Sequence, residues 1–198
     1  MPQTPASADF PSLPLPDFQS CLRRAEALPL PEVLALLSGR DYWHTQAAGG
    51  ARALRLTDGP HGIRRQLGDQ TTADLNCSAP ATCYPTAAAL AASWNPQLVR
   101  EVGEMLGREG RAEGVDVLLG PGLNLKRSPL CGRNFEYFSE DPLLSGDLAA
   151  AWVGGIQSQG VGASLKHFVA NNQEYRRMSI DAVVDERALR ELYLAGFE

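Results

Sequence analysis

The sequence is poor in cysteine and in basic residues, and both shortages limit what the protein can be. Its four cysteines, Cys21, Cys77, Cys83 and Cys131, include no pair with the CxxC spacing of a metal site. They are also too sparse for a disulfide framework, so we expect reduced thiols, as in an intracellular protein. Lys and Arg number 18 against 23 Asp and Glu, a net charge of -5. That balance argues against a nucleic-acid partner or an anionic membrane surface.

Long apolar runs and nucleotide-binding fingerprints are missing as well. No run approaches the roughly 18 residues of a membrane-spanning helix, and Met1 to Ala6 lacks the basic and apolar regions of a signal peptide. We therefore expect a cytoplasmic protein. Neither GxGxxG nor GxxxxGK[ST] follows a strand pattern, and Gly103, Gly107 and Gly110 lie inside a helical pattern, where they indicate packing. We expect no metal and no cofactor.

The chain divides into two predicted units. Residues 1–31 contain seven prolines, which predicts an extended leader with a short helix around residues 18–28. Residues 32–198 form the second unit, which opens with a helix that ends at Gly39. The composition of the whole chain, with 44% hydrophobic and 21% charged residues, is ordinary for a globular protein.

Strand and helix patterns alternate through the second unit. Strands are expected at 51–57, 115–119, 161–168 and 180–184, and the one at 161–168 is expected to be buried. The apolar segment 85–94 is expected to be the strand of a further strand–helix alternation. Helices are expected from Asn95–Pro96 to about residue 113, from 143 to Gly160, and from Asp185 onward. Residues 64–82 are expected to form a long surface loop. Such alternation predicts an α/β fold with a parallel sheet.

Three polar motifs follow predicted strands: Asp58-Gly59-Pro60, residues 127–136, and Lys166-His167-Phe168. The carboxyl ends of parallel strands share one edge, where active sites lie both in barrels and in doubly wound sheets. We therefore expect the three motifs to meet at that edge.

Each motif taken alone also has a plain structural interpretation. Asp58 fits a turn whose carboxylate accepts a backbone hydrogen bond. The charged residues 124–136 fit a solvated loop, and His167 fits a hydrogen-bonded core histidine. Strand alternation would also place Lys166 and His167 on opposite faces, unless the strand curls at its end.

The neighbouring residues favour a polar pocket that binds carbohydrate. Residues 137–142 alternate aromatic and acidic side chains, a mixture that suits stacking on a sugar ring and hydrogen bonding to its hydroxyls. Residues 171–174 are polar and follow Lys166-His167 closely, and Arg177 could close the far side of such a pocket.

Four motifs in matching order resemble the N-terminal domain of glycoside hydrolase family 3, nearest to its bacterial β-glucosidases. They are DGP at 58–60, RSPLCGRNFE at 127–136, SEDP at 139–142 and KHFVANNQE at 166–174. The resemblance covers the chain from about residue 30 onward. It implies a (β/α)8 TIM-like barrel, incomplete at the C-terminus here. The implied substrate is a small-molecule or oligosaccharide β-glycoside, cleaved with retention of configuration.

The resemblance also implies which residues contact the sugar: Asp58, Arg133, Lys166, His167 and Arg177. One carboxylate and four donors could fix a sugar ring through charge-assisted hydrogen bonds. Arg127 belongs to the same motif and is given a structural role. A later histidine, found in the KHFPGHG-like motif of the hexosaminidase branch, is absent after Lys166-His167, which favours a glucosidase-like protein.

No catalytic residue is assigned to this chain. A retaining glycosidase needs a nucleophilic carboxylate and an acid roughly 5 Å apart. In the family the nucleophile lies in an SDW-like motif on a later strand, and the acid/base lies further on; no SDW occurs here. Nothing around Asp58, Glu136 or Glu174 supports either role. We expect the chain to be the N-terminal part of a longer enzyme and to be inactive alone.

Two alternatives remain. The chain could be a catalytically inactive sugar-binding module, or part of an unrelated α/β barrel such as a sugar-phosphate isomerase with its phosphate loops beyond residue 198. The sequence makes no prediction of the oligomeric state.

Overall fold

The computed structural model describes residues 17–72, 74 and 76–198. The first sixteen residues of the expected leader lie outside this part of the chain. The leader's short helix is confirmed, since α1 spans Phe18–Glu26. Helix α2 spans Leu30–Leu36, so the boundary expected between residues 31 and 32 falls inside a helix. The division into two units stays a prediction.

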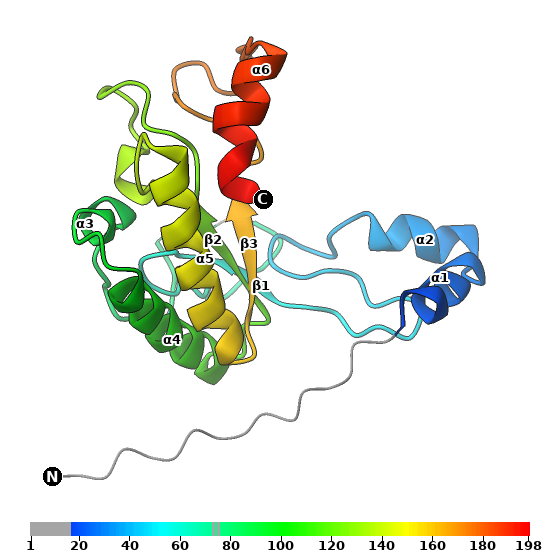
Figure 1. The fold of residues 1–198 in the computed structure, drawn as a ribbon. Coiled ribbons are helices and arrows are strands. Elements are labelled where there is room, and N and C mark those ends of the chain that lie inside the picture. The colour runs from blue at the N-terminus through cyan, green and yellow to red at the C-terminus, as the bar shows by residue number, and fades with distance from the viewer. Residues whose placement is uncertain (1–16, 73, 75) are drawn as a thin grey trace, which may run out of the picture.

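A small parallel sheet lies at the centre of the fold (Figure 1). Its strands are β1 (Leu56–Asp58), β2 (Val117–Gly122) and β3 (Gly162–Lys166). The spatial order is β1-β2-β3, and both neighbouring pairs are parallel. The expected α/β fold is thereby confirmed.

Helices connect the strands and flank the sheet. They are α3 (Ala87–Ala91), α4 (Pro96–Ala112), α5 (Pro142–Ser158) and α6 (Glu186–Ala188). Short 3-10 helices span Asn134–Glu136 (η1) and Ala195–Phe197 (η3), and a π-helical segment spans Leu189–Leu194 (η2). The expected caps are confirmed at Asn95 and Asp185, whose side chains accept backbone N–H groups of the first helical turn. Helices α4 and α5 run side by side over one face of the sheet (Figure 1).

Two strand predictions were wrong, and a third was right only in part. Residues 85–94 contain the short helix α3 instead of a strand, because the Thr86 side chain accepts the Ala89 N–H as a cap and the run of alanines favours a helix. Residues 180–184 form no strand, and the chain there leaves a turn in which the N–H of Ile180 bonds to the carbonyl of Arg176. The expected buried strand at 161–168 is the shorter β3, none of whose residues is buried. Within the described residues β3 pairs on one side only, with β2.

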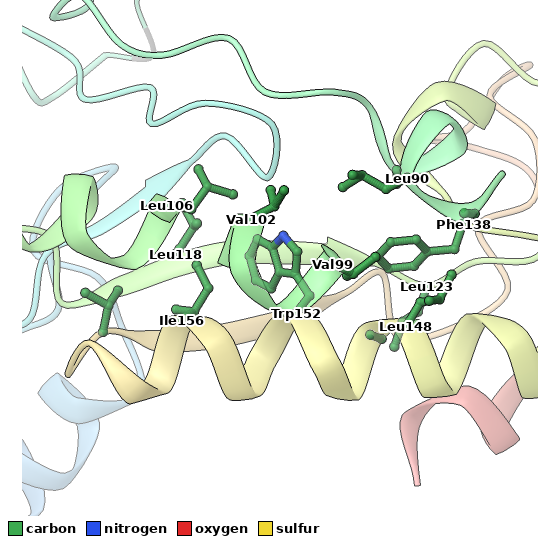
Figure 2. Close-up of a cluster of buried hydrophobic side chains, with 14 of the residues drawn as sticks. Leu90, Val99, Val102, Leu106, Leu118, Leu123, Phe138, Leu148, Trp152 and Ile156 are labelled. Atoms are coloured by element: carbon green, nitrogen blue, oxygen red, sulfur yellow. The ribbon is translucent and has the colours of Figure 1, made fainter. Parts of the chain in front are cut away.

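The hydrophobic core lies between the sheet and the helix pair α4–α5 (Figure 2). Trp152 of α5 is almost fully buried and lies among Val99 and Val102 of α4 and Leu118 of β2. Gly103 permits this close packing, because a Cβ atom there would lie 2.5 Å from the carbonyl oxygen of Trp152. The glycine spacing in α4 therefore serves helix packing, as the sequence pattern indicates.

No helix in the described part of the chain has the length and apolar character needed to cross a lipid bilayer. The same residues include no group of three or more His, Cys, Asp or Glu side chains placed to hold a metal ion.

The buried face of α5 gives a stability prediction with a control on the same helix. Leu148→Ala should lower the free energy of unfolding by about 2–5 kcal/mol, because Leu148 is fully buried and its loss leaves a cavity. Leu143→Ala should change it by less than about 0.5 kcal/mol, since that side chain is 73% exposed. Urea unfolding followed by tryptophan fluorescence measures both values, and equal losses would contradict this assignment of the core.

Candidate functional site

The carboxyl ends of the three strands bring the polar motifs to one edge of the sheet. Asp58 is the last residue of β1, and Lys166 is the last residue of β3. The Nζ atom of Lys166 lies 2.8 Å from Oδ1 of Asp58, so the two ends meet across β2. The prediction that Asp58 and Lys166 share an edge is therefore confirmed.

Seven charged side chains form a row of ion pairs of alternating sign at this edge, here called the ion-pair row. In order they are Arg64, Asp58, Lys166, Glu136, Arg133, Glu174 and Arg177. Successive N–O distances are 3.3 Å (Arg64–Asp58), 2.8 Å (Asp58–Lys166), 3.4 Å (Lys166–Glu136), 3.8 Å (Arg133–Glu174) and 3.4 Å (Glu174–Arg177). Arg133 donates a direct hydrogen bond from Nε to Glu136. Each carboxylate is thus shared by two cations.

Asp58 is held by distant charges as well as by its own turn. Its carboxylate contacts Lys166, which is 108 residues away, and Arg64. Burial pushes the pKa of Asp58 upward, but the Lys166 charge and hydrogen bond, the Gly59 N–H and the Arg64 charge together bring this pKa below its usual value. A local turn therefore accounts for only part of the environment of Asp58.

His167 is held neutral with one defined tautomer. Arg133 Nη2 lies 2.7 Å from His167 Nε2, and a guanidinium can only donate, so Nε2 must accept. The proton then resides on Nδ1, which lies 3.2 Å from the Asn124 side-chain oxygen and 3.1 Å from the Tyr137 hydroxyl. Burial and the charges of Arg133 and Lys166 lower the pKa of His167 to about 4.

Lys166 and His167 both reach this site. Strand alternation would place them on opposite faces, but β3 ends at Lys166, so the alternation does not extend to His167. Asn124, two residues after the end of β2, fixes the backbone of His167 on both sides. Its amide donates to the His167 carbonyl at 2.9 Å, and its oxygen accepts the His167 N–H at 2.8 Å.

Arg177 lies at the outer end of the ion-pair row. Its side chain is 47% exposed and contacts Oε2 of Glu174. The Oε1 atom of Glu174 faces Arg133 and accepts from the Asn171 amide at 2.8 Å, so Glu174 links Arg177 to Arg133. A hollow of about 370 Å³ lies beside Asn171 and Arg177. Arg127 lines the same hollow, but it donates to the Tyr193 hydroxyl and lies over the Tyr193 ring, which fits a structural role.

Sequence reasoning left out three members of the row: Arg64, Glu136 and Glu174. The signal for Arg64 is the turn that begins at Asp58-Gly59-Pro60 and returns the chain, so that the Arg64 N–H bonds to the Asp58 carbonyl at 3.0 Å. Glu136 and Glu174 lie inside the motifs that were singled out. Their roles depend on contacts between segments far apart in the sequence, which periodicity does not report.

Comparison with known proteins identifies the family. Residues 49–198 match the family model described as the glycosyl hydrolase family 3 N terminal domain. The chain belongs to glycosyl hydrolase family 3. The resemblance seen in the four motifs is therefore confirmed.

Two curated relatives of the chain are glycosidases by name. The chain is 61% identical over 171 residues to thermostable beta-glucosidase B of Acetivibrio thermocellus, a match that covers 85% of this chain and 23% of that protein. It is 52% identical over 174 residues to an exo-alpha-(1->6)-L-arabinopyranosidase of Bifidobacterium longum, covering 86% and 23%. The chain thus spans less than a quarter of the length of these relatives.

The solved structures give the same family and fold. Beta-glucosidase 3B from Thermotoga neapolitana, in complex with alpha-D-glucose, superposes with a TM-score of 0.80 at 44% identity. The match covers 90% of this chain and 27% of that one. The family 3 chain described here is therefore similar in fold to a part of a larger glucose-binding enzyme.

The pKa of His167 gives a prediction of pH dependence. An unfolded histidine has a pKa near 6.5, so between about pH 6.5 and pH 4 the unfolded chain binds a proton at this residue that the folded chain does not. The stability contributed by neutral His167 is therefore complete above about pH 6.5 and is lost as the pH falls toward 4. His167→Gln should remove this part of the pH dependence of the free energy of unfolding.

Urea unfolding at a series of pH values measures the effect, and the NMR shift of the His167 ring proton reports its titration directly. A His167 titration midpoint near 6.5 in the folded chain would contradict the proposed tautomer and its contacts.

Proposed function

We propose that this chain is the sugar-binding part of a retaining β-glucosidase that removes terminal β-D-glucosyl or related β-glycosyl residues. The observation that carries the proposal is the ion-pair row at the carboxyl edge of the sheet. Four of the five residues expected to bind sugar, Asp58, Arg133, Lys166 and Arg177, are members of it, and the fifth, His167, bonds to Arg133.

The three strands are proposed to be the first part of a (β/α)8 barrel. Their spatial order follows their order in the sequence, and the segments between them contain the helices α4 and α5. Barrel strands are added in this sequential way, whereas the flavodoxin type of doubly wound sheet already reverses direction within its first three strands. The first three strands of the Rossmann type are also sequential, but that type carries a GxGxxG fingerprint after its first strand, where this chain has Asp58-Gly59-Pro60. The strand order and the missing fingerprint together favour the barrel.

The sugar-binding role follows from the donors and acceptors present. The Asp58 carboxylate can accept hydrogen bonds from two neighbouring hydroxyls of a sugar ring. Lys166 and Arg133 can donate to other hydroxyls, and Nε2 of His167 can accept one when Arg133 turns to the ligand. Because the row already holds these groups close together, only the contact between Arg133 and His167 has to be exchanged on binding.

The carboxylates of the row are proposed to bind and position the sugar rather than attack it. Asp58, Glu136 and Glu174 each contact two cations, which stabilise the charged form and make the oxygens less nucleophilic. A general acid must instead hold a proton, and a nucleophile needs an oxygen free to attack. We propose that both catalytic carboxylates come from residues outside this sequence.

The first test separates binding from hydrolysis. The 198-residue chain should not hydrolyse an aryl β-glucoside, whereas the polypeptide translated from the complete reading frame should. Release of the aryl group followed by absorbance measures both. Hydrolysis by the 198-residue chain would overturn the assignment of catalysis to other residues. A complete reading frame that ends at Glu198, with a product that binds glucose, would favour the inactive sugar-binding module.

The second test addresses Asp58 in the complete enzyme. Asp58→Ala should weaken glucose binding and lower kcat/KM by at least about 10-fold, because one hydrogen bond to a charged group contributes roughly 1.5–3 kcal/mol. Asp69→Ala is the matched control, since the Asp69 carboxylate is exposed and bonds to Thr71 nearby. Circular dichroism should show both variants folded. Gross unfolding of Asp58→Ala would instead support the turn interpretation.

A further inference from the structure

Glu136 is the most deeply buried charged residue of the ion-pair row. Only 5% of the residue is exposed, and its two carboxylate oxygens serve different partners. Oε1 accepts from Arg133 Nε, and Oε2 lies 3.4 Å from Lys166 Nζ. A buried carboxylate is unfavourable unless it is paired, so this side chain has little freedom to leave either cation.

The backbone at Glu136 is fixed against the end of β2. Gly122, the last residue of β2, bridges to Tyr137, the residue after η1. A Cβ atom at position 122 would lie 2.6 Å from the carbonyl oxygen of Glu136 and 2.8 Å from the Tyr137 ring, so this approach requires glycine. Glu136 of η1 is therefore held against the end of β2, the middle strand, between the ends of β1 and β3.

From this position Glu136 orients three of the expected sugar-binding residues. It contacts Arg133 and Lys166 directly. The Nη2 atom of the same Arg133 lies 2.7 Å from His167, so the carboxylate also acts on His167 through Arg133. The Glu136 charge further opposes the effect of the Arg133 and Lys166 charges on the pKa of His167.

Glu136 also competes with Asp58 for Lys166. The Lys166 ammonium lies 2.8 Å from Asp58 and 3.4 Å from Glu136, so it is shared between a partly exposed and a buried carboxylate. Without the Glu136 charge, Asp58 would be the remaining anionic partner of Lys166 and would draw the ammonium away from its present place. The buried charge thus holds Lys166 between the two carboxylates.

We propose that Glu136 is the positioning residue of the sugar-binding site: it touches no sugar itself but sets the placement of Arg133, Lys166 and His167. This inference rests on the proposed sugar-binding function. It assigns a role to the last residue of the GRNFE motif, which the sugar-binding set above leaves out.

The test compares variants of the complete enzyme by glucose inhibition and by kcat/KM. Glu136→Gln keeps the shape but removes the charge, and it should weaken glucose binding and lower kcat/KM by at least about 10-fold. Glu136→Asp keeps the charge on a shorter stem and should recover part of this loss. Glu101→Gln is the matched control: Glu101 lies exposed on α4 and has no ion pair within the described residues, so both values should stay within about twofold of wild type.

A double-mutant cycle distinguishes positioning from a general structural role. If Glu136 acts through Arg133, Glu136→Gln should cost much less in an Arg133→Gln background than in wild type. Equal costs in the two backgrounds would overturn the proposal, and so would wild-type glucose binding by Glu136→Gln. If Glu136→Gln does not fold, Glu136→Asp is measured in its place, and unchanged glucose binding by that variant would overturn the proposal.

The Asp58→Ala variant, measured together with the Glu136 variants, distinguishes a failure of the Glu136 role from a failure of the sugar site. A loss of glucose binding in Asp58→Ala but not in Glu136→Gln would overturn the role of Glu136 and leave the sugar site standing. Glucose binding unaffected by Asp58→Ala would overturn the sugar site itself, and with it the role of Glu136.

Discussion

The contact between Asp58 and Lys166 depends on the register of the whole sheet. These residues end the first and third strands, and they meet only because β1 and β3 both run parallel to β2, with Asp58 opposite Leu119 and Lys166 opposite Gly122. A slip of one residue in either strand would turn its last side chain to the other face of the sheet. The core between the sheet and the helices α4 and α5 fixes that register, so the packing of Trp152 and Leu118 indirectly determines the geometry of the ion-pair row.

The ion-pair row avoids an electrostatic problem that the proposed sugar site would otherwise face. The site needs several charged donors and acceptors close together, yet like charges repel and buried charges lose hydration. Alternating the sign places each carboxylate between two cations. His167 adds a donor and an acceptor without a further charge, because its pKa is lowered to about 4. The result is a set of groups held in place before any ligand binds.

The sequence predicted the location of the site better than its contacts. Parallel strands put Asp58 and Lys166 at one edge, and this follows from periodicity alone. The motif resemblance singled out Arg133 and His167. Glu136 could not be assigned a role from sequence, because its two ion-pair partners are Lys166 at the end of β3 and Arg133 just before η1. The strand expected at 180–184 failed for a related reason: a β-branched run forms a strand only if a neighbour pairs with it, and here the segment leaves a turn instead.

Exposure differs between the centre and the flanks of the ion-pair row, and this difference suits the two parts to different roles. The centre is the most buried, with the Glu136 side chain 6% exposed and that of Lys166 14% exposed. The flanks are open, with Asp58 34% exposed and Arg177 47% exposed. Glu136 is too buried to meet a ligand, whereas the neighbouring Arg133 and Lys166 remain partly accessible. Buried charge at the middle of a polar site is then understandable: it costs hydration, but it fixes the spacing of cations that the proposed sugar ligand would meet.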